Sequence, residues 1–266
     1  MRTRPVWGIL AATVLAVTGC SAQDDPGAPS AGASAGTPSA PASSSAADPA
    51  AAAALGQAAA ALGNTSFKVT MTSGPSFKLD GVMDAPGGKG SAEVKSTGTN
   101  TELTVSTRLV GENLYVQVPG LTKAGTWTRI DISRLPEGAN VGLRPGQIDP
   151  ANTAKLLTST TDVRQTDARS FTGTLDLTKA AGLTGVSQVT IDKYGTAAQN
   201  VPFTAGLDDQ GRLSALTIQL PPLGGQQVQP LEVLYTDYGV TVEDLTPPAA
   251  TVVDAPEDVY KALGGR

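Results

Sequence analysis

The chain has 266 residues, with 19 Lys and Arg, 24 Asp and Glu, no histidine and a formal net charge of −5. The lack of histidine excludes Ser-His-Asp and Cys-His catalytic sites and zinc sites that use histidine. The lack of a long basic run argues against nucleic-acid binding. Carboxylate-pair chemistry remains possible, but the acidic residues are scattered, and we interpret them as solvated. We therefore predict no catalytic site, no metal, no cofactor and no enzymatic activity.

The N-terminus has the pattern of a secretory signal peptide over residues 1–19. A cationic start, Met1–Arg4, precedes an apolar run from Val6 to Val17, which is shorter than the ~20 residues that span a bilayer. The run ends in Val17-Thr18-Gly19-Cys20, which resembles a bacterial lipobox, where the cysteine thiol is diacylated after cleavage. An ordinary signal peptide with a bystander cysteine is the alternative. Because Cys20 is the single cysteine, we favour lipidation at Cys20 and a lipid-anchored location on the extracytoplasmic face of the cell membrane.

A tether and one domain are expected after the signal. Residues 21–47 are almost entirely Ala, Ser, Pro, Gly and Thr, a composition that buries too little apolar surface to fold. We interpret residues 20–47 as a disordered tether with a reach of roughly 30 Å. No later apolar run approaches membrane-spanning length, so we expect residues 48–266 to form a single domain that is anchored rather than inserted.

The domain is predicted to begin with a helix over residues 50–62. Alanine dominates this stretch, Asp48-Pro49 provides an N-cap and a first-turn proline, and Gly63-Asn64 ends it. Its large apolar side chains, Leu55 and Leu62, are few, so we expect the helix to pack against another element.

The period then changes to two, which predicts strands with one apolar and one wet face. Tight-turn residues such as Ala85-Pro86-Gly87-Gly88 separate the runs and predict antiparallel hairpins. We interpret Trp127 as a buried structural residue rather than a ligand-stacking one, and the chain around it from 119 to 145 as otherwise irregular. The predicted strands of this half are Phe67–Met71, Phe77–Leu79, Ala92–Val94, Leu103–Leu109 and Leu114–Val118.

The second half is predicted to mix short helices and strands. Asp149 as N-cap and Pro150 at the first position open a helix through Leu157, and Leu177–Leu183 is a helical turn or a short helix. Asp208–Gly211 is a hairpin turn, and Pro256–Leu263 is a final helix with acids in its first turn. The predicted strands are Thr172–Leu177, Val189–Ile191, Val201–Phe203, Leu216–Leu220, Leu231–Tyr235 and Val240–Val242.

These elements predict an α+β fold with one large antiparallel sheet of about ten strands. A sheet of this size tends to curl, and a curled apolar face that a few helices fill only in part leaves a cavity. By period-two geometry one apolar set points inward. The residues that we predict to line an apolar ligand cavity are Phe67, Val69, Met71, Leu114, Val116, Val118, Phe203, Leu216, Ile218 and Val233.

Several motifs in sequence order resemble the LppX/LprAFG lipoproteins of mycobacteria and their actinobacterial relatives. They are the lipobox at Cys20, the hairpin Val110–Tyr115, the Trp127 segment, the Asp149-Pro150 helix opening, the run from Val201 through Leu213, and the tail from Asp237 to Pro248. The resemblance covers most of the domain. It implies a half-barrel sheet with helices on its concave face, an apolar cavity for acylated lipids, and no catalytic residues.

Two functions follow as expectations. The first is a lipoprotein that binds, and in some cases carries, acylated lipids or glycolipids, because acyl chains need a dry, concave, apolar surface. Its partners would be the membrane, through Cys20, and an envelope protein or lipid exporter. The second is a non-catalytic envelope interaction or regulatory module that uses the same fold to bind a protein partner.

Overall fold

The computed structural model describes residues 48–98, 102–120, 122–136, 139, 141, 143–179 and 188–264. These residues belong to one compact unit. The predicted signal peptide, Cys20 and the tether lie outside the described residues. Within the described ranges, no helix is long and apolar enough to cross a membrane.

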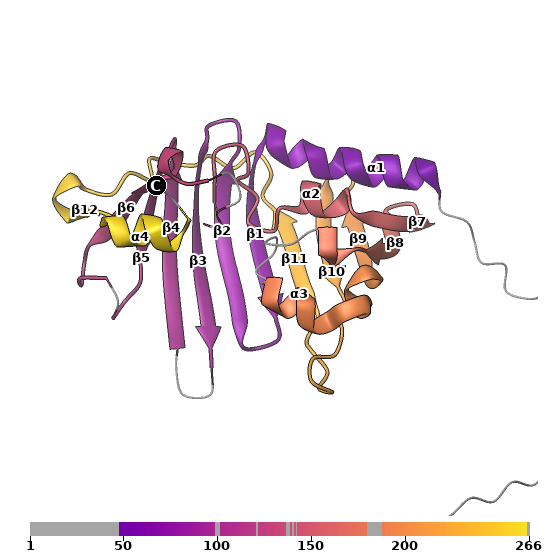
Figure 1. Ribbon diagram of the computed structural model, residues 1–266. Coiled ribbons are helices and arrows are strands. Elements are labelled where there is room, and N and C mark those ends of the chain that lie inside the picture. Colours follow the sequence, from indigo (N-terminus) through magenta and orange to yellow (C-terminus); the bar gives the residue numbers. More distant parts are fainter. Residues whose placement is uncertain are drawn as a thin grey trace, which may run out of the picture. The chain divides into compact units, whose positions relative to one another are not determined.

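The described chain is built on one 12-stranded sheet with the order β12-β6-β5-β4-β3-β2-β1-β11-β10-β9-β8-β7 (Figure 1). All neighbouring strands are antiparallel except β12 and β6, which are parallel. The predicted α+β class with a large antiparallel sheet is therefore confirmed. The strands are β1 (Ser66–Ser73), β2 (Phe77–Asp84), β3 (Lys89–Thr97), β4 (Glu102–Val110), β5 (Asn113–Gln117), β6 (Trp127–Asp131), β7 (Thr160–Asp167), β8 (Ser170–Leu175), β9 (Val201–Leu207), β10 (Leu213–Ile218), β11 (Leu231–Thr236) and β12 (Val252–Asp254).

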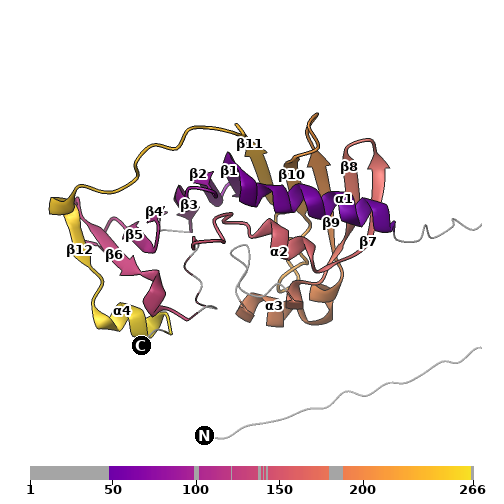
Figure 2. The same ribbon diagram turned by 90° about the horizontal axis from the view of Figure 1, so that it is seen from above.

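The helices are short and lie to one side of the sheet. Seen from above, the sheet is bent, and α2 and α3 lie on the inside of the bend (Figure 2). We call the face toward α2 and α3 the inner face. The α-helices are α1 (Pro49–Ala60), α2 (Thr153–Leu157), α3 (Gln188–Tyr194) and α4 (Glu257–Ala262), and the 3₁₀ helices are η1 (Ala61–Asn64), η2 (Ile132–Arg134), η3 (Leu177–Lys179), η4 (Gly195–Gln199) and η5 (Ala249–Thr251).

Helix α1 begins and ends close to where the sequence predicts. The Asp48 side chain accepts a hydrogen bond of 2.9 Å from the Ala50 N–H, and Pro49 occupies the first turn. Such a cap satisfies a backbone donor that the helix leaves free. The helix contacts β7 and β10 and packs on α2, and its buried face includes Leu55 and Ala59.

Two series of consecutive antiparallel strands meet at a seam in the middle of the sheet. Strands β1 to β6 follow one another in space as in sequence, and so do β7 to β11. The seam pairs β1 with β11, which places Val69 opposite Tyr235 and Met71 opposite Val233. The first strand of the domain therefore lies in the centre of the sheet, and the edges are β7 and β12.

The segment from β11 to β12 crosses the sheet without strand structure of its own. Ser66 donates to the Val240 carbonyl at 2.6 Å, and Lys89 donates to the Val242 carbonyl, also at 2.6 Å. Val242 is buried. The predicted strand Val240–Val242 is therefore wrong, because side chains of the sheet, and not a neighbouring strand, satisfy these carbonyls.

Two other sequence predictions need correction. The helix expected from Asp149 begins only at Thr153, because Asn152 adopts left-handed backbone angles (φ 49°) at its N-cap and interrupts the helix. The expected strand Val189–Ile191 is part of helix α3, in which Ile191 and Tyr194 are buried at a helical spacing and Val189 is exposed. Three strands, β6, β7 and β12, were not predicted as strands.

Candidate functional site

The predicted cavity residues share the inner face of the sheet. Eight of them are at most 2% exposed and belong to one hydrophobic core: Phe67, Val69, Met71, Leu114, Phe203, Leu216, Ile218 and Val233. Val116 is half-buried against that core, and Val118 is half-buried just beyond the end of β5. The structure therefore brings these side chains to one face, but it buries them to different depths.

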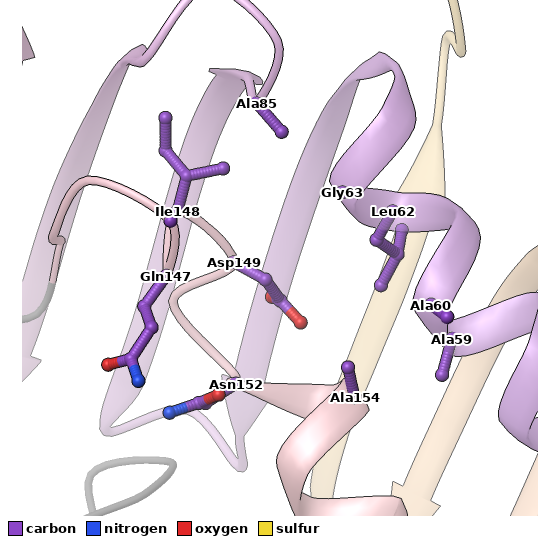
Figure 3. Close-up of a pocket in the computed structure, with 11 residues that line it drawn as sticks. Ala59, Ala60, Leu62, Gly63, Ala85, Gln147, Ile148, Asp149, Asn152 and Ala154 are labelled. Carbon is purple, nitrogen blue, oxygen red and sulfur yellow. The ribbon is translucent and has the colours of Figure 1, made fainter.

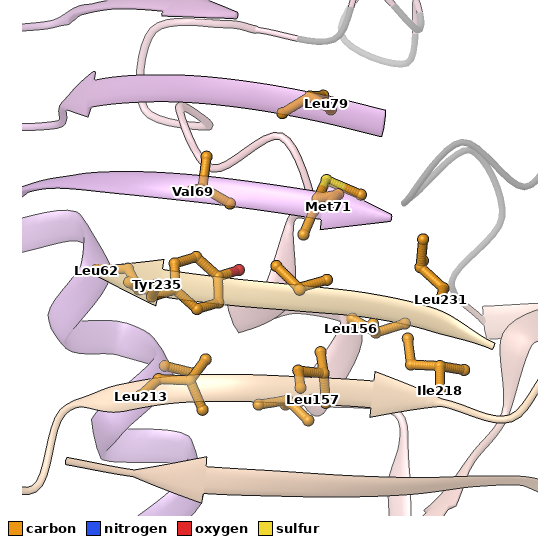
Figure 4. Packing of buried hydrophobic residues seen from close by; sticks show 14 of the residues in the cluster. Leu62, Val69, Met71, Leu79, Leu156, Leu157, Leu213, Ile218, Leu231 and Tyr235 are labelled. Carbon is orange, nitrogen blue, oxygen red and sulfur yellow. The ribbon is translucent and has the colours of Figure 1, made fainter. Parts of the chain in front are cut away.

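The inner face has two halves with different covers. Strands β1 and β7–β11, which we call the helix-covered half, lie beneath α1 and α2. Figure 4 shows Leu156 and Leu157 of α2 among the side chains of β1, β2, β10 and β11. Strands β2–β6, the loop-covered half, share the core with residues 132–136 and 143–149, in which the side chains of Ile132, Leu135, Leu143 and Ile148 are buried.

Glycines let large side chains fill the helix-covered half. A Cβ atom at Gly173 of β8 would lie 2.8 Å from the Phe203 ring, so the ring rests directly on the glycine backbone. Phe203 is 1% exposed. Because protein interiors are close-packed, little space remains here for another molecule.

The loop-covered half is most deeply buried at one end. A Cβ atom at Gly90 of β3 would lie 2.7 Å from the Met83 sulfur and 3.5 Å from Cγ1 of Ile148. Ile148 and Met83 therefore pack over Gly90, at the end of the strands that carries Leu109, Leu114 and Ile130.

Farther along the same strands, smaller and half-buried side chains form a contiguous strip. Val94 pairs with Val105, and Val116 of β5 lies between Thr107 and Thr128 in the register. The Thr107 hydroxyl donates to the Ala92 carbonyl at 3.2 Å, so it is satisfied within the sheet. All the residues of this half-buried strip have intermediate exposure: Val94, Val105, Thr107, Val116 and Thr128.

A polar cluster that the sequence did not predict lies where the two halves meet. Asp149 accepts hydrogen bonds from the Ala151 N–H (3.0 Å) and the Thr153 N–H (2.8 Å), and the Tyr235 hydroxyl lies 3.0 and 3.1 Å from its two oxygens. The Thr153 and Tyr235 hydroxyls are 2.5 Å apart. Burial raises the pKa of the Asp149 carboxyl, and the hydrogen bonds from Thr153, Ala151 and Tyr235 only partly oppose it. Burial and the nearby Asp149 charge also raise the pKa of Tyr235 well above its usual value.

A pocket of about 280 Å³ adjoins this cluster. Its walls come from the C-terminal end of α1 and from η1, the turn after β2, the loop 146–149 and the start of α2. Figure 3 shows the Asp149 carboxylate pointing from its loop towards the space between Leu62 and Ala154. The residues around the pocket are Ala59, Ala60, Leu62, Gly63, Ala85, Gly146, Gln147, Ile148, Asp149, Asn152 and Ala154.

Trp127 lies away from both features. It is half-buried on β6, and the Arg108 guanidinium stacks over its ring with 4.5 Å between the guanidinium carbon and the ring centroid. Trp127 is thus less buried than we expected. In the described part of the chain, no group of three or more His, Cys, Asp or Glu side chains is placed to hold a metal ion.

Comparison with known proteins adds no further identification. No protein-family model matches the chain, and no curated protein shows significant similarity to it.

Proposed function

We propose that this protein is a non-catalytic, membrane-anchored lipoprotein that binds acylated lipids on the inner face of its sheet. In this proposal the bent sheet acts as a half-barrel, and an acyl chain lies along the half-buried strip on its inner face. The observation that carries the proposal is the strip itself, a mostly aliphatic surface in register on β3–β6 that remains only half-buried.

The chemistry of the strip suits an acyl chain. Val94, Val105 and Val116 present only methyl groups, and the Thr107 hydroxyl is already bonded to the Ala92 carbonyl. Transfer of apolar surface from water to such a face contributes about 25 cal/mol per Å². A hydrocarbon chain needs no polar partner there, whereas a polar ligand would leave its own hydrogen-bonding groups unsatisfied.

The membrane attachment is the second part of the proposal and derives from the sequence. The lipobox that ends in Cys20 would carry two acyl chains, which hold a protein more firmly than one chain does. Replacement of Cys20 by Ala should release the folded protein from the membrane fraction. If the variant stayed bound after a high-salt wash, the anchor assignment would be wrong.

Tryptophan substitutions test the lipid site. Val116→Trp should leave the protein folded, because Val116 is only half-buried, and should remove lipid that co-purifies from the native host. Val233→Trp should destabilise the protein by about 1–3 kcal/mol or more, because Val233 is fully buried. Ser106→Trp is the matched control, since Ser106 lies on the opposite face of β4 from Val105 and should retain the lipid.

Mass spectrometry of organic extracts, together with thermal unfolding, gives the readout. Folded Val116→Trp with wild-type lipid content would contradict the lipid site. Wild-type protein with no lipid in its extract would contradict lipid binding itself and would favour the interaction module.

A further inference from the structure

An exposed valine continues the half-buried strip to the edge of the sheet. Val253 of β12 is 54% exposed. Strand β12 pairs in parallel with β6, and the register places Val253 beside Thr128, which in turn lies opposite Val116. Neighbours in register share a face of the sheet, so Val253 lies on the inner face, as the strip does. Strand β12 is the outermost strand on this side of the described sheet (Figure 1), so the strip reaches an open edge.

The other end of the strip meets the hydrophobic core. Between β4 and β3, Thr107 lies opposite Ala92 and Val105 lies opposite Val94. One strand farther, Val94 lies opposite Leu79 of β2. Ala92 and Leu79 are each 7% exposed and belong to the core. The strip is therefore bounded by buried side chains at β3 and β2, and it is open at β12.

The strip is longer across the strands than along them. Across the strands it passes over β3, β4, β5, β6 and β12, which are separated by spacings of about 4.8 Å, so it extends over roughly 19 Å. Along β5, only Val116 lies between the buried Leu114 and the end of that strand. Along β4, the half-buried positions Thr107 and Val105 span about 7 Å before Leu103, which is 40% exposed. A long acyl chain therefore keeps the most apolar contact when it crosses the strands.

We propose that the strip holds a single acyl chain across the strands, with the methyl end at β3 and the polar end leaving the protein over Val253 at the β12 edge. This inference rests on the proposed function and adds the direction, the exit and the length of the bound chain. C–C bonds of about 1.5 Å at tetrahedral angles advance a chain by about 1.3 Å per carbon. A path of roughly 19 Å then accommodates about 14–16 carbons, and carbons beyond that length lie in water.

A series of single-chain lipids tests the length. The probes are lysophosphatidylcholines with ten to twenty carbons in steps of two, used with the full chain below their micelle concentrations. In equilibrium dialysis, Kd should fall about fourfold or more for each added pair of carbons up to about sixteen, because each methylene that leaves water adds affinity. From there to twenty carbons it should change less than about twofold. A plateau that begins below fourteen carbons or above eighteen would overturn the inference alone, whereas failure of every chain to bind would contradict the proposed function as well.

Two aspartate substitutions test the direction of the chain. Val253 and Leu103 are both exposed apolar residues at borders of the strip, on β12 and β4, so both variants should stay folded. Val253→Asp should raise the Kd of the sixteen-carbon lipid at least fivefold, because a charged group would lie in the path of the chain. It should change the Kd of the ten-carbon lipid less than about twofold, because that chain ends before β12. Leu103→Asp is the matched control and should leave both Kd values unchanged.

Three results would overturn this direction while leaving lipid binding intact. A larger effect of Leu103→Asp than of Val253→Asp would show that the chain runs along β4. An equal effect of Val253→Asp on both lipids would place the methyl end at β12. An unchanged Kd of the sixteen-carbon lipid in Val253→Asp would show that the chain does not reach that edge.

Discussion

The two halves of the inner face carry similar apolar alternation but differ in how they are filled. In the helix-covered half, Phe203 lies on Gly173, and the leucines of α1 and α2 complete a dry core. In the loop-covered half, Ile148 and Met83 fill one end, and the half-buried strip follows. The alternation of apolar residues along a strand therefore determines which side chains face inward. The element that covers the sheet determines whether those side chains become buried core or remain partly exposed.

The largest expected effect is on the free energy of unfolding, and it compares a buried side chain of the helix-covered half with a half-buried one of the strip. Phe203→Ala should lower the free energy of unfolding by about 3–5 kcal/mol, because it removes a buried ring and leaves a cavity. Val105→Ala in the strip should cost only about 1 kcal/mol, because the side chain is half-buried. Chemical denaturation measures both. Equal losses would show that the two halves are packed alike.

A smaller loss of stability should follow when a glycine of the packed inner face is replaced by alanine. Gly173→Ala should cost about 1–3 kcal/mol, because the new Cβ would lie 2.8 Å from the Phe203 ring and 3.1 Å from the Thr161 carbonyl oxygen. Gly206→Ala on the neighbouring β9 is the matched control. Its nearest neighbour would be the Ser214 hydroxyl at 3.4 Å, so its stability should stay within about 0.5 kcal/mol. If Gly173→Ala left the stability unchanged, tight packing in this half would be contradicted.

The junction between the halves should respond to loss of one hydroxyl. Tyr235→Phe keeps the ring, which packs edge-on against Phe67 with 5.6 Å between centroids. It removes the hydrogen bonds to Asp149 and Thr153. We expect a loss of about 1–3 kcal/mol in thermal or chemical unfolding, because buried polar groups lose a partner. An unchanged stability would mean that water replaces the hydroxyl.

The subtlest effect is a pH dependence at the same junction. Because burial raises the pKa of Asp149 above its ordinary value of 3.8, the folded state binds more protons than the unfolded state between these two pKa values. The contribution of Asp149 to stability is therefore greatest below pH 3.8 and is lost as the pH rises through the raised pKa. Asp149→Asn removes this titration, so stability measured against pH should fall more, from acid towards neutral, in the wild type than in the variant. Parallel curves would contradict the raised pKa.

The sequence predicted those elements whose pattern is complete within a short stretch of chain. The Asp48-Pro49 cap predicted α1, and period-two alternation predicted β1, because both patterns are complete within a few residues. Strand β7 carries one buried apolar side chain, Val163, as expected of an edge strand, so it has almost no alternation to detect.

The other misses have equally physical reasons. Val189 and Ile191 fit both the two-residue period of a strand and the 3.6-residue period of a helix, because the run is so short. The helical pattern shows only in the burial of Ile191 together with Tyr194, three residues later. The inward direction of the predicted site residues followed from alternation, but their depth of burial depends on distant elements. The pairing of Asp149 with Tyr235 joins residues far apart in sequence, and Asp149 alone resembled an ordinary helix cap.

The seam between β1 and β11 has a consequence for the order of folding. Each series of strands pairs neighbours in sequence, whereas the seam joins residues such as Lys68 and Thr236, which lie far apart in the sequence. Closing so long a loop is entropically unfavourable, and non-local strand pairing slows folding. We expect the two series to gain structure first and the seam to close last. Substitutions at Val69 and Val233 should then accelerate unfolding and leave the refolding rate nearly unchanged in stopped-flow experiments.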